Sequence, residues 1–231
     1  AFQNCLTLST IKNFGIVEGV GDYSFANTAI SEAFIPSTLS YIGASPYMGC
    51  KLTNIRLEEG STKFVVRDGA LFDSALTTLY AYPVAREGAL EIPETVEVIK
   101  ASVFNANLNV KTLVIGANVT AIEDSAFEDA TNLESIEFKA SEKQLMVGEK
   151  VFKGTKALTT VTISSRIAEI GNSMFMNSGL TSVTFEAGLE KIGNSAFAGC
   201  VNLSELTFNG EAVIKEIGSS AFSNSKLTTF A

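Results

Sequence analysis

The sequence predicts an α/β solenoid, in which short units stack along one axis instead of folding around a single central core. Three observations lead to this fold class. One phrase recurs in degraded form along all 231 residues, its anchor aromatic returns mostly every 22–25 residues, and alternating apolar residues follow each aromatic. A unit this short cannot bury its apolar positions alone, so it must bury them against its neighbours.

The recurring phrase is clearest at residues 192–208, which read Ile-Gly-Asn-Ser-Ala-Phe-Ala-Gly-Cys-Val-Asn-Leu-Ser-Glu-Leu-Thr-Phe. Its anchor aromatic marks the same position in each unit and predicts a column of stacked rings. These anchors are Phe2, Phe25, Tyr47, Phe72, Phe104, Phe127, Phe152, Phe175, Phe197 and Phe222.

Each unit is predicted to contain one short strand after its aromatic. In the clearest copy, Leu206 and Phe208 flank one polar residue, and this apolar–polar–apolar alternation is typical of a strand with one buried face. Stacked units would place such strands in parallel, about 4.8 Å apart. The segments around the aromatics are too short for long helices, so we expect turns, 3₁₀ helix or one to two helical turns.

A second aliphatic pair precedes each aromatic, as at Leu189 and Ile192, and glycine often follows this pair. Glycine at a fixed repeat position suits a tight turn or a close approach of two backbones. The glycines concerned are Gly21, Gly43, Gly171, Gly193 and Gly218.

These residues resemble the BspA-type leucine-rich repeats, whose pattern is I-G-x-x-A-F-x-x-C-x-x-L-x-x-I-x-I-P. Residues 192–208 and 122–138 are near-consensus copies, and the similarity covers essentially the whole chain. Residues 62–72, with Leu79 and Tyr82 after them, are similar to a longer variant repeat of that family. The resemblance implies a right-handed, curved leucine-rich repeat solenoid of about ten repeats.

We expect one continuous domain over residues 1–231. The longer repeat makes 58–103 irregular, and the polar stretch 139–150 is predicted to be a loop at the edge of the solenoid. Both ends of the sequence fall inside a repeat without a visible polar cap, which favours a fragment of a longer protein. End-to-end packing of two copies over the terminal units is the alternative.

The charge of the chain argues against two classes of partner. The net charge is −8, and both halves of the sequence are acidic. Nucleic acids and anionic membranes normally require a surface rich in lysine and arginine. No apolar run reaches the roughly 18 residues of a membrane span, and no signal peptide is visible at Ala1.

The residues available for chemistry predict no catalytic residue, no metal site and no cofactor. The sequence has no histidine, which removes the usual base of Ser–His–Asp and Cys–His sites. Cys5, Cys50 and Cys200 each follow an anchor aromatic by three residues, where other units have small residues. We therefore expect three free, largely buried thiols, and we interpret the carboxylates around Phe127 as a solvated acidic turn.

The surface that could bind a partner is the outward face of the strands. The residue after the central aliphatic of each strand should form a column, and Phe34, Arg56, Tyr80 and Val114 are predicted to occupy consecutive positions in it. Aromatic residues and arginine are enriched at interface hot spots, so these four residues are the candidate partner-binding patch. The alternative is that the irregular segment 58–90 covers Phe34 and Tyr80.

The resemblance also implies a function class. BspA-type repeats are common in surface and secreted proteins of gut and oral bacteria, and some members are adhesins. We therefore expect a non-catalytic, extracellular or cell-surface scaffold that binds a host, matrix or other surface protein. A glycan is the alternative partner, with Tyr80 and Phe34 stacking on sugar rings. A structural spacer without a ligand is the remaining alternative.

Overall fold

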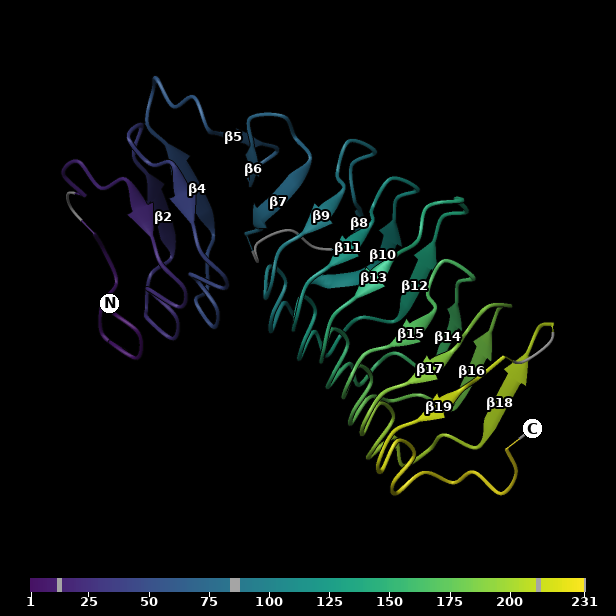
Figure 1. Ribbon diagram of the computed structural model, residues 1–231. Helices are drawn as coiled ribbons and strands as arrows, with labels where there is room; N and C mark the ends of the chain where they lie inside the picture. Colours follow the sequence, from purple (N-terminus) through teal and green to yellow (C-terminus); the bar gives the residue numbers. More distant parts are fainter. Residues whose placement is uncertain (12–13, 84–87, 211–212, 231) are drawn as a thin grey trace.

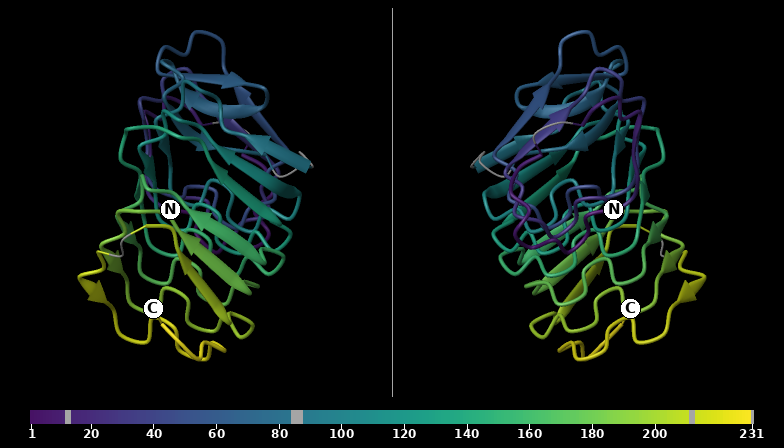
Figure 2. Two further views of the ribbon diagram at one scale, coloured as in Figure 1. Left: turned by 90° about the vertical axis from the view of Figure 1, so that its right-hand side faces the viewer. Right: turned by 90° about the vertical axis from the view of Figure 1, so that its left-hand side faces the viewer.

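The computed structural model describes residues 1–11, 14–83, 88–210 and 213–230, and these wind into the curved solenoid that the sequence predicts (Figure 1). Its turns stack along one axis, as two further views also show (Figure 2). The described residues contain strands and turns but no helix. The segments expected to be turns, 3₁₀ helix or short helix are therefore turns.

One row of strands carries the predicted apolar–polar–apolar alternation. The row consists of β2 (Glu32–Ile35), β4 (Asn54–Leu57), β8 (Gly88–Glu91), β10 (Val110–Ile115), β12 (Ser135–Phe138), β14 (Thr160–Ile163), β16 (Ser182–Phe185) and β18 (Glu205–Phe208). The row is divided into three sheets, β2–β4, β8–β10–β12 and β14–β16–β18, in which neighbouring strands pair in parallel. In the last sheet the strands are in register, so that Val161, Val183 and Leu206 lie side by side on the buried face.

A second row of two-residue strands forms at the aliphatic pair before each aromatic. Such strands are too short to show an alternation in the sequence, which is why only the longer row was predicted. We call them the short-strand row: β1 (Gly19–Val20), β3 (Tyr41–Ile42), β9 (Val98–Ile99), β11 (Ala121–Ile122), β13 (Met146–Val147), β15 (Glu169–Ile170), β17 (Lys191–Ile192) and β19 (Glu216–Ile217).

An antiparallel hairpin interrupts the parallel stacking. Strand β5 (Phe64–Arg67) pairs antiparallel with β6 (Ala70–Asp73), and β6 pairs antiparallel with β7 (Thr78–Ala81). The β5–β6 loop is Asp68-Gly69, and both residues have positive φ, at 51° and 77°. Asp-Gly is a preferred pair for such two-residue hairpin loops, because both positions require left-handed backbone.

The hairpin changes which residue joins the aromatic column. Phe72 was expected there, but it lies on β6, and Tyr82 contacts Phe104 in its place, with the ring centroids 4.8 Å apart and the planes tilted by 46°. From Phe104 the rings continue in contact at 4.6–5.5 Å through Phe127, Phe152, Phe175, Phe197 and Phe222. A separate column joins Phe2, Phe25 and Tyr47.

The turns around each aromatic are not helical because two residues per turn adopt left-handed backbone. Around Phe197 these are Ser195, at φ 55°, and Gly199, at φ 73°. Helix requires consecutive right-handed residues, so two such positions four residues apart prevent it. The second position is occupied mostly by Asn, Asp or Gly, the residues that tolerate this conformation: Asn4, Asn27, Gly49, Asp129, Gly154, Asn177, Gly199 and Asn224.

The repeated glycines allow a close approach of neighbouring turns. A Cβ added to Gly193 would lie 2.8 Å from both the backbone nitrogen of Asn172 and the carbonyl oxygen of Ile170. These short distances confirm the predicted close approach of two backbones. Gly193 does not have positive φ, so a left-handed turn conformation does not explain why glycine occupies this position. The side chain of Asn172 then accepts a hydrogen bond from the amide of Asn194 at 2.8 Å.

We predict that Gly193→Ala lowers the free energy of unfolding by about 1–3 kcal/mol, because the added methyl group must push two turns apart. Gly21→Ala is the matched control at the same repeat position, since its Cβ would meet only Ser24 Oγ, at 3.7 Å. The control should change stability by less than about 0.5 kcal/mol. Urea unfolding followed by circular dichroism measures both, and equal midpoints for the two variants would contradict this account.

The three thiols are free, as predicted, but only two are buried. Cys200 Sγ donates to the carbonyl of Phe175 at 3.1 Å and lies 3.2 Å from Ser178 Oγ, and Cys50 contacts Phe25 and Thr28 in the same way. Cys5 is exposed, so the expectation of burial is wrong for this residue. It lies on the first turn, where a described turn covers only one side.

Candidate partner-binding surface

Phe34, which is half-buried, and Arg56, which is exposed, form a cluster on the longer strand row. They are directly opposite each other on β2 and β4, because these two strands pair in parallel and in register. The Arg56 guanidinium lies 4.6 Å from the centroid of the Phe34 ring, and Arg56 Nε lies 3.3 Å from Glu32 Oε1. A cation over an aromatic face is attractive and holds both side chains in place. We call these three residues the Phe34–Arg56 cluster.

Val114 and Tyr80 do not join this cluster. Val114 lies on β10, opposite Glu91 of β8 and Glu137 of β12, in a separate sheet. Tyr80 lies on β7, which pairs with β6 and with β9 of the short-strand row. The expectation that the four residues occupy consecutive positions in one column is therefore wrong. The antiparallel hairpin carries β7 into the other row, and Glu91 takes the expected place of Tyr80.

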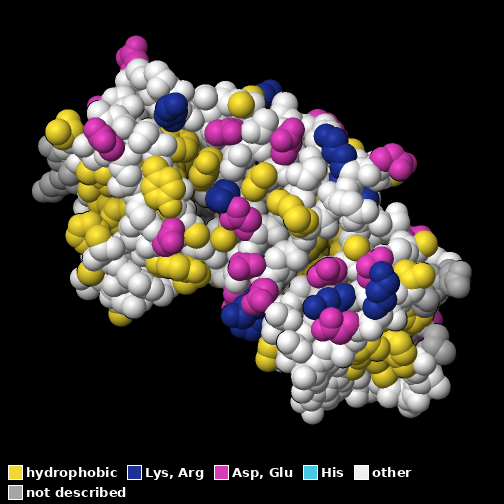
Figure 3. All heavy atoms as spheres, viewed as in Figure 1, with side chains coloured by type: hydrophobic (Ala, Val, Ile, Leu, Met, Phe, Trp, Pro, Cys, Tyr) yellow, Lys and Arg dark blue, Asp and Glu magenta, His cyan; other side chains and the backbone are white. Residues whose placement is uncertain are grey.

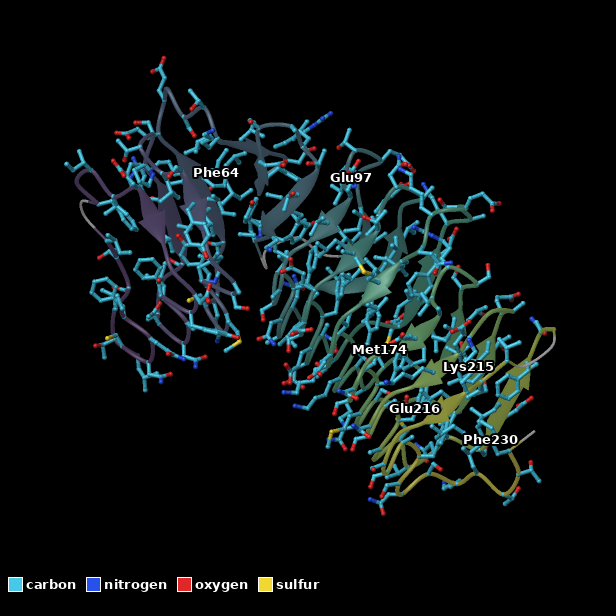
Figure 4. All side chains as sticks on the ribbon, viewed as in Figure 1. Phe64, Glu97, Met174, Lys215, Glu216 and Phe230 are labelled. Atoms are coloured by element: carbon cyan, nitrogen blue, oxygen red, sulfur yellow. The ribbon has the colours of Figure 1, made fainter. Side chains whose placement is uncertain are left out.

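Tyr80 is partly covered by the irregular segment, as the alternative interpretation proposed. The ring of Phe64, labelled in Figure 4, meets it edge to face at 5.4 Å between centroids. Burial raises the pKa of the Tyr80 hydroxyl. Phe34 remains half-buried on the surface, with the ring of Phe14 at 6.2 Å. Both aromatic candidates are thus partly buried, and of the two only Phe34 lies beside Arg56.

A groove of about 540 Å³ opens farther along the longer strand row, between β12, β14 and the loop after β12. Its lining includes Phe138, Thr162 and the carboxylates Glu137, Glu142 and Glu186. In the described part of the chain, none of these three carboxylates has a lysine or arginine partner within 4.0 Å. The sequence analysis did not identify this groove, because its residues come from different turns.

Arg166 fixes the loop that forms one wall of the groove. Its side chain is buried, at 2% exposure, and burial lowers its pKa. Its guanidinium donates to the carbonyls of Lys143 at 3.0 Å and Lys139 at 3.2 Å. It also donates to the carbonyls of the preceding turn at Gly116, Ala117 and Val119. No sequence signal marked Arg166, because the same repeat position varies from turn to turn and holds Ile16, Thr38, Asn118 and Gly188 elsewhere.

Lys139 anchors the start of the same loop. Its ammonium group contacts Glu91 Oε1 at 2.6 Å and Glu94 Oε1 at 2.8 Å. Hydrogen bonds to these two carboxylates raise the pKa of Lys139, so it stays protonated at neutral pH. The predicted edge loop at 139–150 is a loop only as far as residue 145, because Met146–Val147 form β13 and pair with β11. The side chain of Lys139 fixes the start of the loop, and Arg166 binds the carbonyls of Lys139 and Lys143 within it.

Two carboxylates of the acidic turn around Phe127 form ion pairs with lysines of neighbouring turns. Glu123 Oε1 lies 2.5 Å from Lys100 Nζ, and Glu128 Oε1 lies 2.7 Å from Lys153 Nζ. The described residues contain no group of three or more His, Cys, Asp or Glu side chains placed to hold a metal ion. Nor does the described chain include a helix with the length and apolarity needed to cross a membrane.

Comparison with known families supports the repeat pattern. The model described as "BspA type Leucine rich repeat region" matches in six copies, over residues 1–78, 87–145 and 140–231. A search of curated proteins returns no match.

Solved structures share the fold at low sequence identity. A leucine-rich repeat protein from Eubacterium ventriosum superposes with a TM-score of 0.77 and 22% identity, covering 97% of this chain and 67% of that one. The pneumococcal vaccine antigen PcpA gives 0.73 and 20%, covering 99% and 54%. A leucine-rich cell surface protein from Faecalibacterium prausnitzii gives 0.76 and 25%, covering 84% and 52%. The chain thus spans about half to two thirds of these structures.

Proposed function

Since the chain belongs to the BspA-type leucine-rich repeat family, we propose that it is a non-catalytic scaffold that binds another protein through its longer strand row. The observation that carries this proposal is the Phe34–Arg56 cluster, an aromatic and a guanidinium group held in contact on an open sheet face. Solenoids offer extended surfaces of this kind for binding. We place the protein at the cell surface or outside the cell, as an adhesin-like module.

The chemistry of the cluster suits a protein partner. Arg56 keeps most of its side chain exposed, at 63%, while its guanidinium is already oriented by Phe34 and Glu32. Such preorganisation lowers the entropy that binding costs. The free donors of Arg56 can pair with a partner carboxylate, and aromatic and arginine side chains are enriched at hot spots. Val114, flanked by Glu91 and Glu137, would lie at the rim of the same interface.

A protein partner is favoured over a glycan by what covers the two aromatic rings. Sugar rings stack on open aromatic faces, but Arg56 covers one face of Phe34 and Phe64 packs against Tyr80. A ligand-free spacer would leave the Phe34–Arg56 cluster without a role. The cell surface protein and the vaccine antigen among the similar structures support the proposed location.

The test is a binding screen with the double variant Phe34→Ala/Arg56→Ala. We expect the unmodified protein to bind at least one protein in an immobilised panel of extracellular-matrix and surface proteins, and the double variant to bind it about 10- to 100-fold more weakly. Thr184→Ala/Thr207→Ala, on β16 and β18 of the same row, is the control and should bind normally. Circular dichroism must show that both variants stay folded.

Three results would contradict the proposal. Unchanged affinity of the double variant would show that the partner binds elsewhere, and the acidic groove beside β12 would then be the next surface to test. Binding on a glycan array, with no protein bound in the panel, would favour the sugar-binding alternative. Absence of binding in both screens would favour the spacer.

A further inference from the structure

The hydrogen-bonded stacking of the solenoid is broken after residue 58. In regular turns, three amides around the anchor aromatic donate to carbonyls of the next turn, as Ser125, Phe127 and Asp129 do to residues 149, 151 and 153. The equivalent amides of Ser45, Tyr47 and Gly49 donate to none of the described residues. Neither row of described strands pairs across this point, since β1–β3 and β2–β4 form separate two-stranded sheets. Strand pairing also stops between β12 and β14 and between β13 and β15, but there the amides of Lys150, Phe152 and Gly154 still donate to the next turn.

We call residues 1–58 the N-terminal block and residues 59–230 the C-terminal block. Among the described residues, hydrogen bonds join the turns within each block, but the turn amides make none from one block to the other. Among the described residues, one hydrogen bond crosses the boundary, from Ser45 Oγ to Ser102 Oγ at 2.9 Å. No ion pair or ring contact between described residues crosses it. The aromatic column stops at Tyr47 and starts again at Tyr82.

The apolar core is divided at the same place. One buried cluster contains the residues of the N-terminal block, and the other extends from the hairpin to Ala221. The hairpin contributes to both clusters from opposite faces of its strands. Leu71, Ala81 and Phe64 pack with the N-terminal block, whereas Ala70, Phe72 and Leu79 pack with the C-terminal block. Apolar contact of this kind is non-directional, so it resists rotation less than a hydrogen-bond ladder does.

The contact between the blocks is also imperfectly filled. A cavity of about 30 Å³ lies between Tyr47 and Cys50 on one side and Tyr82 and Val103 on the other. This volume is enough for at least one water molecule. Between two regular turns the anchor rings are in contact at the equivalent position, as Phe104 and Phe127 are at 4.6 Å between centroids.

We infer that the protein acts as two rigid blocks that pivot on the β5–β7 hairpin, with the Ser45–Ser102 hydrogen bond as the contact that closes them. A groove of about 530 Å³ lies between the blocks on the side of the short-strand row. Tyr23, Ser45 and Met48 line it from the N-terminal block, and Ser102 and Met146 line it from the other. Figure 3 shows apolar side chains gathered on the face of the molecule that carries the short-strand row. The pivot sets the width of this groove.

Hydrogen exchange of the unmodified protein is the first test. We expect the amides of Ser45, Tyr47 and Gly49 to exchange at least about tenfold faster than those of Ser125, Phe127 and Asp129. The second set is held by carbonyls of the next turn, whereas the first set donates to no described residue and meets water whenever the blocks open. The two sets occupy equivalent positions of the repeat, and the aromatic residue of each set, Tyr47 or Phe127, is buried. Equal protection of the two sets would overturn the inference without requiring any variant to fold.

Spin-label distances measure the pivot itself. In a Cys5→Ser background, one pair of labels is placed at Ala29→Cys and Thr131→Cys, across the boundary. A control pair at Thr131→Cys and Lys226→Cys spans the same number of turns inside the C-terminal block. We expect a broader distance distribution for the first pair, broadened further by Ser45→Ala. Equal widths for both pairs, with no effect of Ser45→Ala, would overturn the pivot.

Discussion

Arg166→Met is expected to lower the free energy of unfolding by about 3 kcal/mol. Methionine keeps much of the apolar volume but leaves the carbonyls of Lys139, Lys143 and the 116–119 turn without their donor. Because the site is buried, water cannot replace these hydrogen bonds without opening the loop. Chemical denaturation followed by circular dichroism measures the loss.

Arg67→Met is the matched control, since Arg67 is an exposed residue at the end of β5. It should change stability by less than about 0.5 kcal/mol. Limited proteolysis gives a second readout, because Arg166→Met should expose the 139–145 loop to cleavage while Arg67→Met should not. If both variants unfold at the same denaturant concentration and resist proteolysis equally, Arg166 does not fix the loop.

Phe152→Ala is expected to lower the free energy of unfolding by about 3–5 kcal/mol. Its ring is fully buried and stacks between those of Phe127 and Phe175, at 5.4 and 5.5 Å between centroids. Removing it leaves a cavity between two turns that hydrogen bonds hold at fixed spacing, so the neighbours cannot collapse into the space. Thermal unfolding is the measurement.

Phe2→Ala is the comparison for this effect. Phe2 belongs to the same repeat position, but its ring is 46% exposed and contacts the single ring of Phe25. Its removal should cost about 1 kcal/mol, since less apolar surface is buried there. A loss for Phe152→Ala as small as that for Phe2→Ala would show that the aromatic column does not carry the stability of the stack.

The regular turns were predictable from the sequence because each repeat position meets its own copy in the next turn. The aliphatic residues Val161, Val183 and Leu206 lie in register, and Gly193 permits a close approach of two backbones, as the pattern indicated. Asn, Asp and Gly two residues after the aromatic were a further signal for left-handed turns, which the sequence analysis did not use.

The candidate site was predictable only where two neighbouring strands pair in register, as β2 and β4 do. Phe34 and Arg56 were correctly placed beside each other, because 22 residues separate them and β2 pairs directly with β4. Tyr80 and Val114 were expected to continue the column across the longer repeat. The Asp68-Gly69 loop redirects the chain there, and counting residues after an anchor no longer gives a position in space.

The sequence by itself determined the repeat, the direction of the strands and the buried face of each turn, because these depend on contacts between equivalent residues of adjacent turns. The tertiary structure alone decided that Tyr82 replaces Phe72 in the column, that Arg166 holds a loop, and that the stacking breaks after residue 58. These three features depend on contacts between non-equivalent residues. The physical reason is that periodicity encodes what is the same in every turn, and carries no information about contacts that occur once.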